Sequence, residues 1–141
     1  MTTTFTGGCL CGRVRYECSA EPIFMGNCHC RDCQRSSGGA YEPDIGLPAG
    51  ALKITGGVKY YEAKAESGNM LSRGFCPECG ASLFGKTTGA PDLAMITAGS
   101  LDNPSLIQAD LGHLYIQRPT LGSHEPGAGQ ISKDAADGRI D

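Results

Sequence analysis

Seven of the eight cysteines of this chain lie in three short segments: Cys9-Leu10-Cys11, Cys28-His29-Cys30-Arg31-Asp32-Cys33 and Cys76-Pro77-Glu78-Cys79. Cysteines one or two residues apart on a tight turn can converge on one metal ion at small entropic cost, because little chain has to be ordered. The first and third segments together offer four thiolates, enough to close a tetrahedral zinc site of the structural kind. The middle segment offers three, which fits a zinc site of the catalytic kind with an open fourth position. We therefore predict two zinc ions, a structural one on Cys9, Cys11, Cys76 and Cys79 and a catalytic one on Cys28, Cys30 and Cys33.

Other roles fit the outer cysteines less well. An iron–sulfur cluster could use the same ligand type, but the spacings differ from those of the ferredoxin runs. No βαβ pattern surrounds Cys76-Pro77-Glu78-Cys79, as a thioredoxin-like redox pair would require. Cys18 stands outside the clusters and is interpreted as a small buried apolar residue. Gly12 and Gly80 directly follow cysteines, where a chain that turns back around a metal often needs positive φ.

For the middle segment the spacing leaves two interpretations open. In the first, a second structural site is closed by His29, by His113 or by a carboxylate. His29 stands between two ligands, so we expect its side chain to point away from them, and His113 could reach the site only through tertiary folding. In the second, the fourth position is left for water or substrate. A zinc ion with three thiolates carries a net charge of about −1. It is therefore suited to hold a substrate thiol as a thiolate.

The composition of the 141 residues fits one small domain. The 21 glycines and 8 prolines favour short strands and turns over long helices. A net charge of −3 argues against nucleic acid as a main partner, since phosphate binding needs a basic face. No apolar run is long enough to span a bilayer, and no signal-peptide core follows Met1. We therefore expect a cytoplasmic protein without a membrane partner, whose cysteines stay reduced.

Short alternating segments predict an all-β fold of antiparallel strands in a single domain. The expected strands are 3–6, 13–17, 23–25, 52–55, 58–61, 70–75, 82–84, 93–96 and 111–117, with one helical turn at 31–36. Gly56-Gly57 separates two of these strands and predicts a hairpin. The last twenty residues contain too few large apolar side chains to offset their ordering entropy. We predict a zinc-binding domain over 1–121 and a disordered tail over 122–141.

Four segments match the pattern of a known family, in the same order. They are Gly8-Cys9-Leu10-Cys11-Gly12-Arg13-Val14-Arg15-Tyr16, Cys28-His29-Cys30-Arg31-Asp32-Cys33, Phe75-Cys76-Pro77-Glu78-Cys79-Gly80-Ala81-Ser82-Leu83 and Gly99-Ser100-Leu101-Asp102-Asn103-Pro104. On these segments the chain resembles the glutathione-dependent formaldehyde-activating enzyme family, which also includes centromere-protein-V-like proteins. The resemblance spans residues 7–118 and does not cover the tail.

This resemblance implies an all-β, zinc-stabilised "β-tent" fold with the same division of the seven cysteines between two zinc ions. It also implies a carbon–sulfur lyase, because the namesake reaction joins glutathione and formaldehyde into S-hydroxymethylglutathione. The expected partners are a glutathione-like small thiol and a small aldehyde, and the catalytic metal would be held by Cys28, Cys30 and Cys33. The alternative from another class is a non-catalytic zinc-stabilised module whose surface binds a protein partner.

One departure from the family pattern bears on substrate binding. Many members carry a tryptophan after the last strand, whereas this chain has Arg118-Pro119-Thr120-Leu121 and no tryptophan. A pocket shaped by that residue would therefore differ here. Arg31, Arg35 and Arg73 are weak candidates to pair with the carboxylates of glutathione, because such arginines are more often solvated surface. Asp102 is interpreted as a turn residue rather than a proton carrier.

Overall fold

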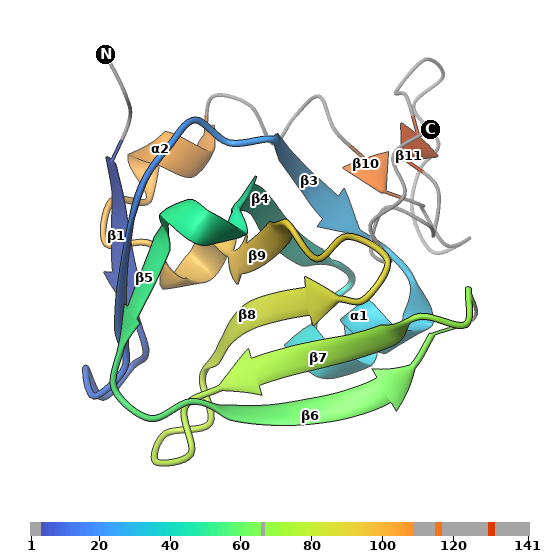
Figure 1. Cartoon of the computed structure of the whole chain (residues 1–141), viewed down its shortest axis with the longest axis horizontal. Coiled ribbons are helices and arrows are strands. Elements are labelled where there is room, and N and C mark those ends of the chain that lie inside the picture. The colour runs from blue at the N-terminus through green and yellow to red at the C-terminus, as the bar shows by residue number, and fades with distance from the viewer. Residues whose placement is uncertain (1–3, 66, 109–114, 117–129, 132–141) are drawn as a thin grey trace.

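The computed structural model describes residues 4–65, 67–108, 115–116 and 130–131, which form two β-sheets with short helices between strands (Figure 1). The strands are β1 (Thr4–Gly8), β2 (Arg15–Ser19), β3 (Phe24–Cys28), β4 (Glu42–Pro48), β5 (Leu52–Thr55), β6 (Lys59–Lys64), β7 (Met70–Phe75), β8 (Ser82–Thr87), β9 (Leu93–Thr97), β10 (Tyr115–Ile116) and β11 (Gln130–Ile131). The helices are α1 (Arg31–Ser37) and α2 (Ser105–Gln108), with single 3-10 turns at η1 (Ala49–Ala51) and η2 (Ala98–Ser100). Within these described ranges, no helix has the length and apolar character needed to cross a membrane.

The strands pair into a small sheet and a large one. The small sheet has the order β1-β2-β5, and the large sheet has the order β11-β10-β3-β4-β9-β8-β7-β6. Every pairing among β1 to β9 is antiparallel, whereas β10 runs parallel to both β3 and β11. The small sheet stands at the left of Figure 1, and α1 lies behind β7 and β8. The expected all-β single domain of antiparallel strands is therefore confirmed over β1 to β9, and the parallel pairings of β10 were not expected.

The large sheet separates two hydrophobic cores, because successive side chains of a strand point to opposite faces. On one face, Ile45 and Leu47 of β4 are fully buried and pack in a core with Phe5 of the small sheet. On the other face, Met95 of β9 packs in a second core with Cys33 of α1. Each fully buried large side chain contributes about 1.5–3 kcal/mol to stability. One sheet is thus the shared wall of both cores.

Most of the expected elements are found within a few residues of their expected positions, and the helical turn becomes α1. The central strand β4 was not expected, because prolines and a glycine interrupt its alternation. Of the strand expected over 111–117, the structure describes only Tyr115–Ile116. The tail expected over 122–141 lies outside the described residues, apart from Gln130–Ile131.

The hairpin expected across Gly56-Gly57 is wrong. β5 pairs with β2 and β6 pairs with β7, so this glycine pair carries the chain from the small sheet to the large one. Gly56 has a φ of +97°, and a Cβ there would lie 2.2 Å from the carbonyl oxygen of Arg13. The segment is therefore a tight crossing that passes against the turn between β1 and β2.

Replacing Gly56 tests this crossing. Gly56→Ala should lower the free energy of unfolding by about 1–3 kcal/mol, because left-handed strain adds to a collision with a backbone carbonyl. Gly57→Ala is the matched control: a Cβ there meets nothing within 4 Å, so the expected change stays within about 0.5 kcal/mol. Urea unfolding of the two variants measures the difference. Equal stabilities would contradict the crossing.

Candidate metal centres

The four-cysteine cluster joins two turns that are far apart in the sequence. Cys9 and Cys11 lie between β1 and β2, and Cys76 and Cys79 lie between β7 and β8. The Sγ atoms of Cys9 and Cys11 are 3.5 Å apart, and those of Cys11 and Cys76 are 3.7 Å apart. All four sulfurs lie within 4.8 Å of one another. A tetrahedral zinc ion with Zn–S bonds of about 2.3 Å separates its sulfurs by about 3.8 Å. The four thiols therefore fit one zinc ion.

The two turns of this cluster share one backbone pattern. In each, the N–H of the first cysteine donates to the carbonyl five residues further on, at 3.0 Å in both cases. The glycine after the second cysteine donates back to the carbonyl of the first. These glycines, Gly12 and Gly80, have φ angles of +79° and +74°. The positive φ expected from the sequence is confirmed at both, and a side chain there would be strained.

The four-cysteine cluster also favours an ionised thiol. The Val14 N–H donates to the Sγ of Cys9 at 3.2 Å. Burial of Cys9 opposes ionisation, but this N–H and the neighbouring thiols of Cys11 and Cys76 outweigh it and lower the pKa of Cys9 to about 6. The thiolate is the form that ligates a metal. A metal ion would therefore meet at least one ready ligand here at neutral pH.

The three-cysteine cluster is built where β3 ends and α1 begins. Cys28 is the last residue of β3, Cys30 is the N-cap of α1, and Cys33 lies in its first turn. The Sγ atoms of Cys28 and Cys30 are 3.5 Å apart, and all three sulfurs lie within 4.8 Å of one another. The Cys33 N–H donates to the Sγ of Cys30 at 3.3 Å. Contacts from the Cys28 and Cys33 thiols lower the pKa of Cys30 to about 2.

No fourth donor joins these three thiols among the residues that the structure describes. The ring of His29 instead packs against Tyr41, with ring centroids 5.1 Å apart, as expected for a side chain that points away from the neighbouring thiols. His113 lies outside the described residues. The geometry therefore fits a metal with three protein thiolates and one further position.

Beside this cluster the sheet places three ionisable side chains that sequence reasoning did not bring together. Cys28 of β3 is paired in register with Glu42 of β4, so Glu42 and Asp44 face the same side as Cys28. Arg73 of β7 places its Nη2 atom 4.0 Å from the Sγ of Cys33. Cys33, Glu42, Asp44 and Arg73 line a cavity of about 20 Å³, which is room for about one water molecule.

The charges around this cavity influence one another strongly. Burial raises the pKa of Glu42. Burial and the nearby Glu42 together raise the pKa of Asp44 well above its usual range. Burial disfavours the charge of Arg73, but Cys33 and Glu42 outweigh this effect and raise its pKa. Arg73 is therefore the cation that offsets the negative charge of the cysteine cluster. In the sequence, the only indication of this group of ionisable side chains was that Glu42 and Asp44 stand two residues apart, as residues on one face of a strand do.

A groove next to the cavity receives two of the three candidate arginines. Arg35 and Arg73 both line it, and its volume is about 450 Å³. Arg73 also lines the small cavity beside Cys33, so the groove leads toward the three-cysteine cluster. Arg31 does not line this groove; it donates to the side-chain oxygen of Gln34 at 2.7 Å.

Two other residues from the sequence analysis have structural roles. Cys18 is fully buried in the first core, as expected. Asp102 forms an ion pair with Arg15, and its N–H donates to the carbonyl of Thr6 at 2.9 Å. The hydrogen bond from Arg15 holds the pKa of Asp102 below its usual range. This pairing gives Asp102 a role in joining chain segments.

Comparison with known proteins places the fold and both clusters in a family. The sequence model for the glutathione-dependent formaldehyde-activating enzyme matches residues 4–118. The chain belongs to this family. No curated protein matches the chain. The structure is similar to the crystal structure of a Rhodobacter sphaeroides protein from a structural genomics programme, with a TM-score of 0.58 and 19% sequence identity over 75% of this chain and 97% of that chain. At that identity the likeness shows the fold alone.

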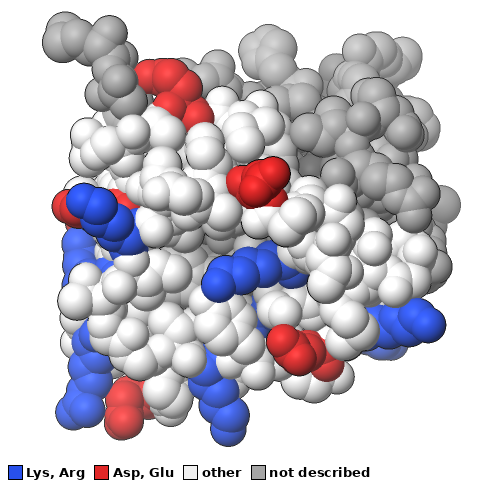
Figure 2. Space-filling model, viewed as in Figure 1, with Lys and Arg blue, Asp and Glu red and all other residues white. Residues whose placement is uncertain are grey.

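The surface of this formaldehyde-activating family member carries both signs of charge. On the face in Figure 2, acidic and basic side chains are interspersed, and the described residues there form no continuous basic patch. Two exposed ion pairs, Arg13–Glu78 and Lys53–Glu17, further mix the charges. This face does not have the electrostatic character of a phosphate-binding surface.

Cys76→Ser should remove about one zinc ion per chain and lower the free energy of unfolding, because a metal bound only by the folded state stabilises that state. Elemental analysis of the purified protein and urea unfolding measure the two effects. Cys18→Ala is the control, since Cys18 is equally buried but belongs to neither cluster. It should keep both ions. Unchanged metal content and stability in Cys76→Ser would show that the four-cysteine assignment is wrong.

Proposed function

We propose that this protein is a zinc-dependent enzyme that joins a glutathione-like thiol to a small aldehyde such as formaldehyde. The observation that carries the proposal is the three-cysteine cluster. Its sulfurs converge as metal ligands do, and the described residues supply no fourth donor. Membership of the formaldehyde-activating family supports the class of substrates.

The chemistry follows from the donor set. A zinc ion on Cys28, Cys30 and Cys33 would lower the pKa of a substrate thiol and hold it as a thiolate. The thiolate sulfur then bonds to the carbonyl carbon of the aldehyde, and the carbonyl π electrons move to the oxygen. That oxygen takes up the proton that the thiol released. With glutathione and formaldehyde the product is S-hydroxymethylglutathione, and proximity of the two reactants supplies much of the rate gain.

The two arginines that line the groove beside the cluster favour a substrate thiol that carries carboxylates. Arg35 projects from the exposed side of α1 into this groove, and a guanidinium group can pair with a carboxylate through two hydrogen bonds. We assign to Arg35 the binding of one carboxylate of glutathione. Arg73, which is already beside Cys33, keeps the charge of the cysteine cluster balanced when the thiolate arrives.

The four-cysteine cluster has the structural role in this proposal. Four thiolates fill a tetrahedral zinc ion and leave no position for substrate. We place the reaction in the cytoplasm, where the reducing poise keeps all seven cluster cysteines available as thiols.

The reaction itself is the first test. NMR exchange between formaldehyde and S-hydroxymethylglutathione should be accelerated by the zinc-loaded protein. Cys30→Ser should abolish the acceleration and release about one zinc ion, with the fold largely retained, whereas Cys18→Ala should keep the activity. If Cys30→Ser exchanges the substrates as fast as the wild type, the proposed site is wrong. If the wild-type protein gives no acceleration, the proposed enzymatic function is wrong, and the alternative of a non-catalytic protein-interaction module is favoured.

Substrate binding has a matched pair of variants. Arg35→Gln should raise the KM for glutathione about tenfold, the value of one charged hydrogen bond. The KM for 2-mercaptoethanol, which has no carboxylate, should not change. Arg31→Gln is the control, because Arg31 does not line the groove. Equal effects of Arg35→Gln on both thiols would remove Arg35 from carboxylate binding.

A further inference from the structure

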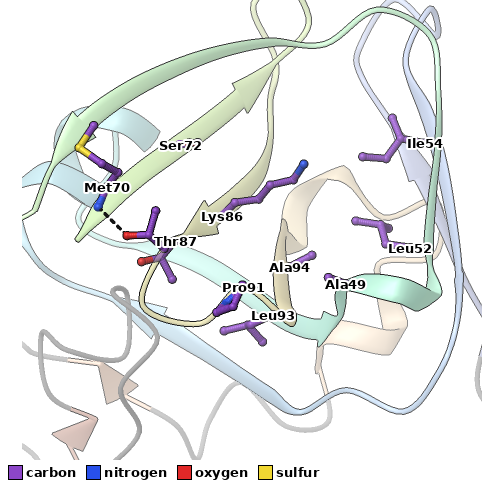
Figure 3. A pocket seen from close by; sticks show the side chains of 11 residues that line it. Ala49, Leu52, Ile54, Met70, Ser72, Lys86, Thr87, Pro91, Leu93 and Ala94 are labelled. Atoms are coloured by element: carbon purple, nitrogen blue, oxygen red, sulfur yellow. Dashed lines mark hydrogen bonds between the residues drawn. The ribbon is translucent and has the colours of Figure 1, made fainter.

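A second pocket, which we call the β5–β8 pocket, opens where the small sheet separates from the large one. β5 pairs only with β2 among the strands that the structure describes, and side chains of β5 and β8 line the pocket together. Leu52 and Ile54 of β5 form one wall, and Ser72, Lys86 and Ala94 of the large sheet lie opposite (Figure 3). The pocket has a volume of about 350 Å³, at the lower end of small-molecule sites, which span roughly 300–1,000 Å³.

The lining of this pocket is amphipathic. Lys86 is its only ionisable side chain, and the remaining lining residues are apolar or carry hydroxyl groups. Figure 3 shows the Lys86 side chain extending from β8 across the space in front of Leu52 and Ile54. An apolar wall that faces a single cation suits a ligand with an apolar chain and one negative end.

Among the residues that the structure describes, no acid forms an ion pair with Lys86. Its Nζ lies 5.0 Å from the centre of the Tyr60 ring, in a cation–π contact that holds the side chain in place. Glu62, on the same side of the sheet, accepts a hydrogen bond from Ser72 at 3.2 Å. Lys86 therefore presents a positive charge over an apolar surface.

The Lys86 end of the β5–β8 pocket faces away from the three-cysteine cluster. Ser72 and Lys86 are paired in register, and so are the next residues along, Arg73 and Gly85. Because side chains alternate along a strand, the first pair faces the small sheet and the second faces the cavity beside Cys33. Leu93, which also lines the pocket, belongs to the second core with Cys28 and Cys33. The end of the pocket that carries the Lys86 charge nevertheless lies on the face of the sheet opposite the cavity beside Cys33.

We propose that the β5–β8 pocket binds a small amphipathic monocarboxylate of about the size of octanoate. The hydrocarbon chain lies against Leu52, Ile54 and Ala94, which removes apolar surface from water on both sides. The carboxylate pairs with the ammonium group of Lys86. The size of the pocket selects a medium-length chain over a long-chain lipid.

Calorimetric titration of the full zinc-loaded chain tests this site, with octanoate and octan-1-ol as probes. The wild type should bind octanoate about tenfold more tightly than the uncharged alcohol, because only the carboxylate forms a charged hydrogen bond. Lys86→Met should remove that preference. Ser72→Phe, which fills the pocket from β7, should abolish the binding of both. Lys53→Met is the control, since Lys53 lies on β5 beside the pocket residues but does not line the pocket.

Three results would overturn the proposal. The first is a wild type that does not bind octanoate at millimolar concentration. The second is a Lys86→Met variant that binds octanoate as tightly as the wild type while circular dichroism shows the same fold. The third is amide shifts on octanoate addition that cluster at 28–33 instead of 52–54, which would place the carboxylate at the three-cysteine cluster. None of these results bears on the glutathione reaction, which is assayed without the probes.

Discussion

The convergence of four thiols on one point is the interaction on which the rest of the structure depends. Cys9 and Cys11 come from the small sheet, and Cys76 and Cys79 come from the large one. A structural zinc ion contributes about 10 kcal/mol or more to folding, which is comparable with the whole stability of a typical domain, about 5–15 kcal/mol. In a chain with only 6% aromatic residues, a zinc ion bound by these four thiols would therefore contribute more to stability than any single packed side chain.

The alternation of side chains across the large sheet then keeps the two clusters apart. Cys9 and Cys76 belong to the core between the sheets, while Cys28 and Cys33 belong to the core beneath α1. The face with the three-cysteine cluster can therefore carry ionisable groups such as Glu42 beside the cysteines, because the core that joins the two sheets lies on the other side. The four-cysteine and three-cysteine clusters are thus divided between two faces of one sheet.

Local features were sufficient for three predictions: ligand spacing predicted both clusters, glycines that directly follow cysteines predicted the positive φ of Gly12 and Gly80, and short alternating segments predicted the all-β class. What sequence reasoning missed depends on tertiary pairing. β4 was not predicted because Pro43, Gly46 and Pro48 interrupt its alternation. Without this strand, the position of Glu42 and Asp44 beside the three-cysteine cluster could not be predicted either. The prediction of a hairpin at Gly56 was wrong for a related reason. Two consecutive strands joined by a glycine turn pair with each other unless each has a better partner elsewhere, and β5 has that partner in β2.

X-ray absorption at the zinc edge tests the central claim most directly, because it counts sulfur ligands. If one cluster is closed by four thiolates and the other is open with three, the zinc-loaded protein should show two zinc ions with an average of about 3.5 sulfurs each. Added glutathione should raise that average to about 4, as a fourth sulfur joins the three-cysteine cluster. An average of about 4 without glutathione, or one that glutathione leaves unchanged, would contradict an open thiol-binding centre.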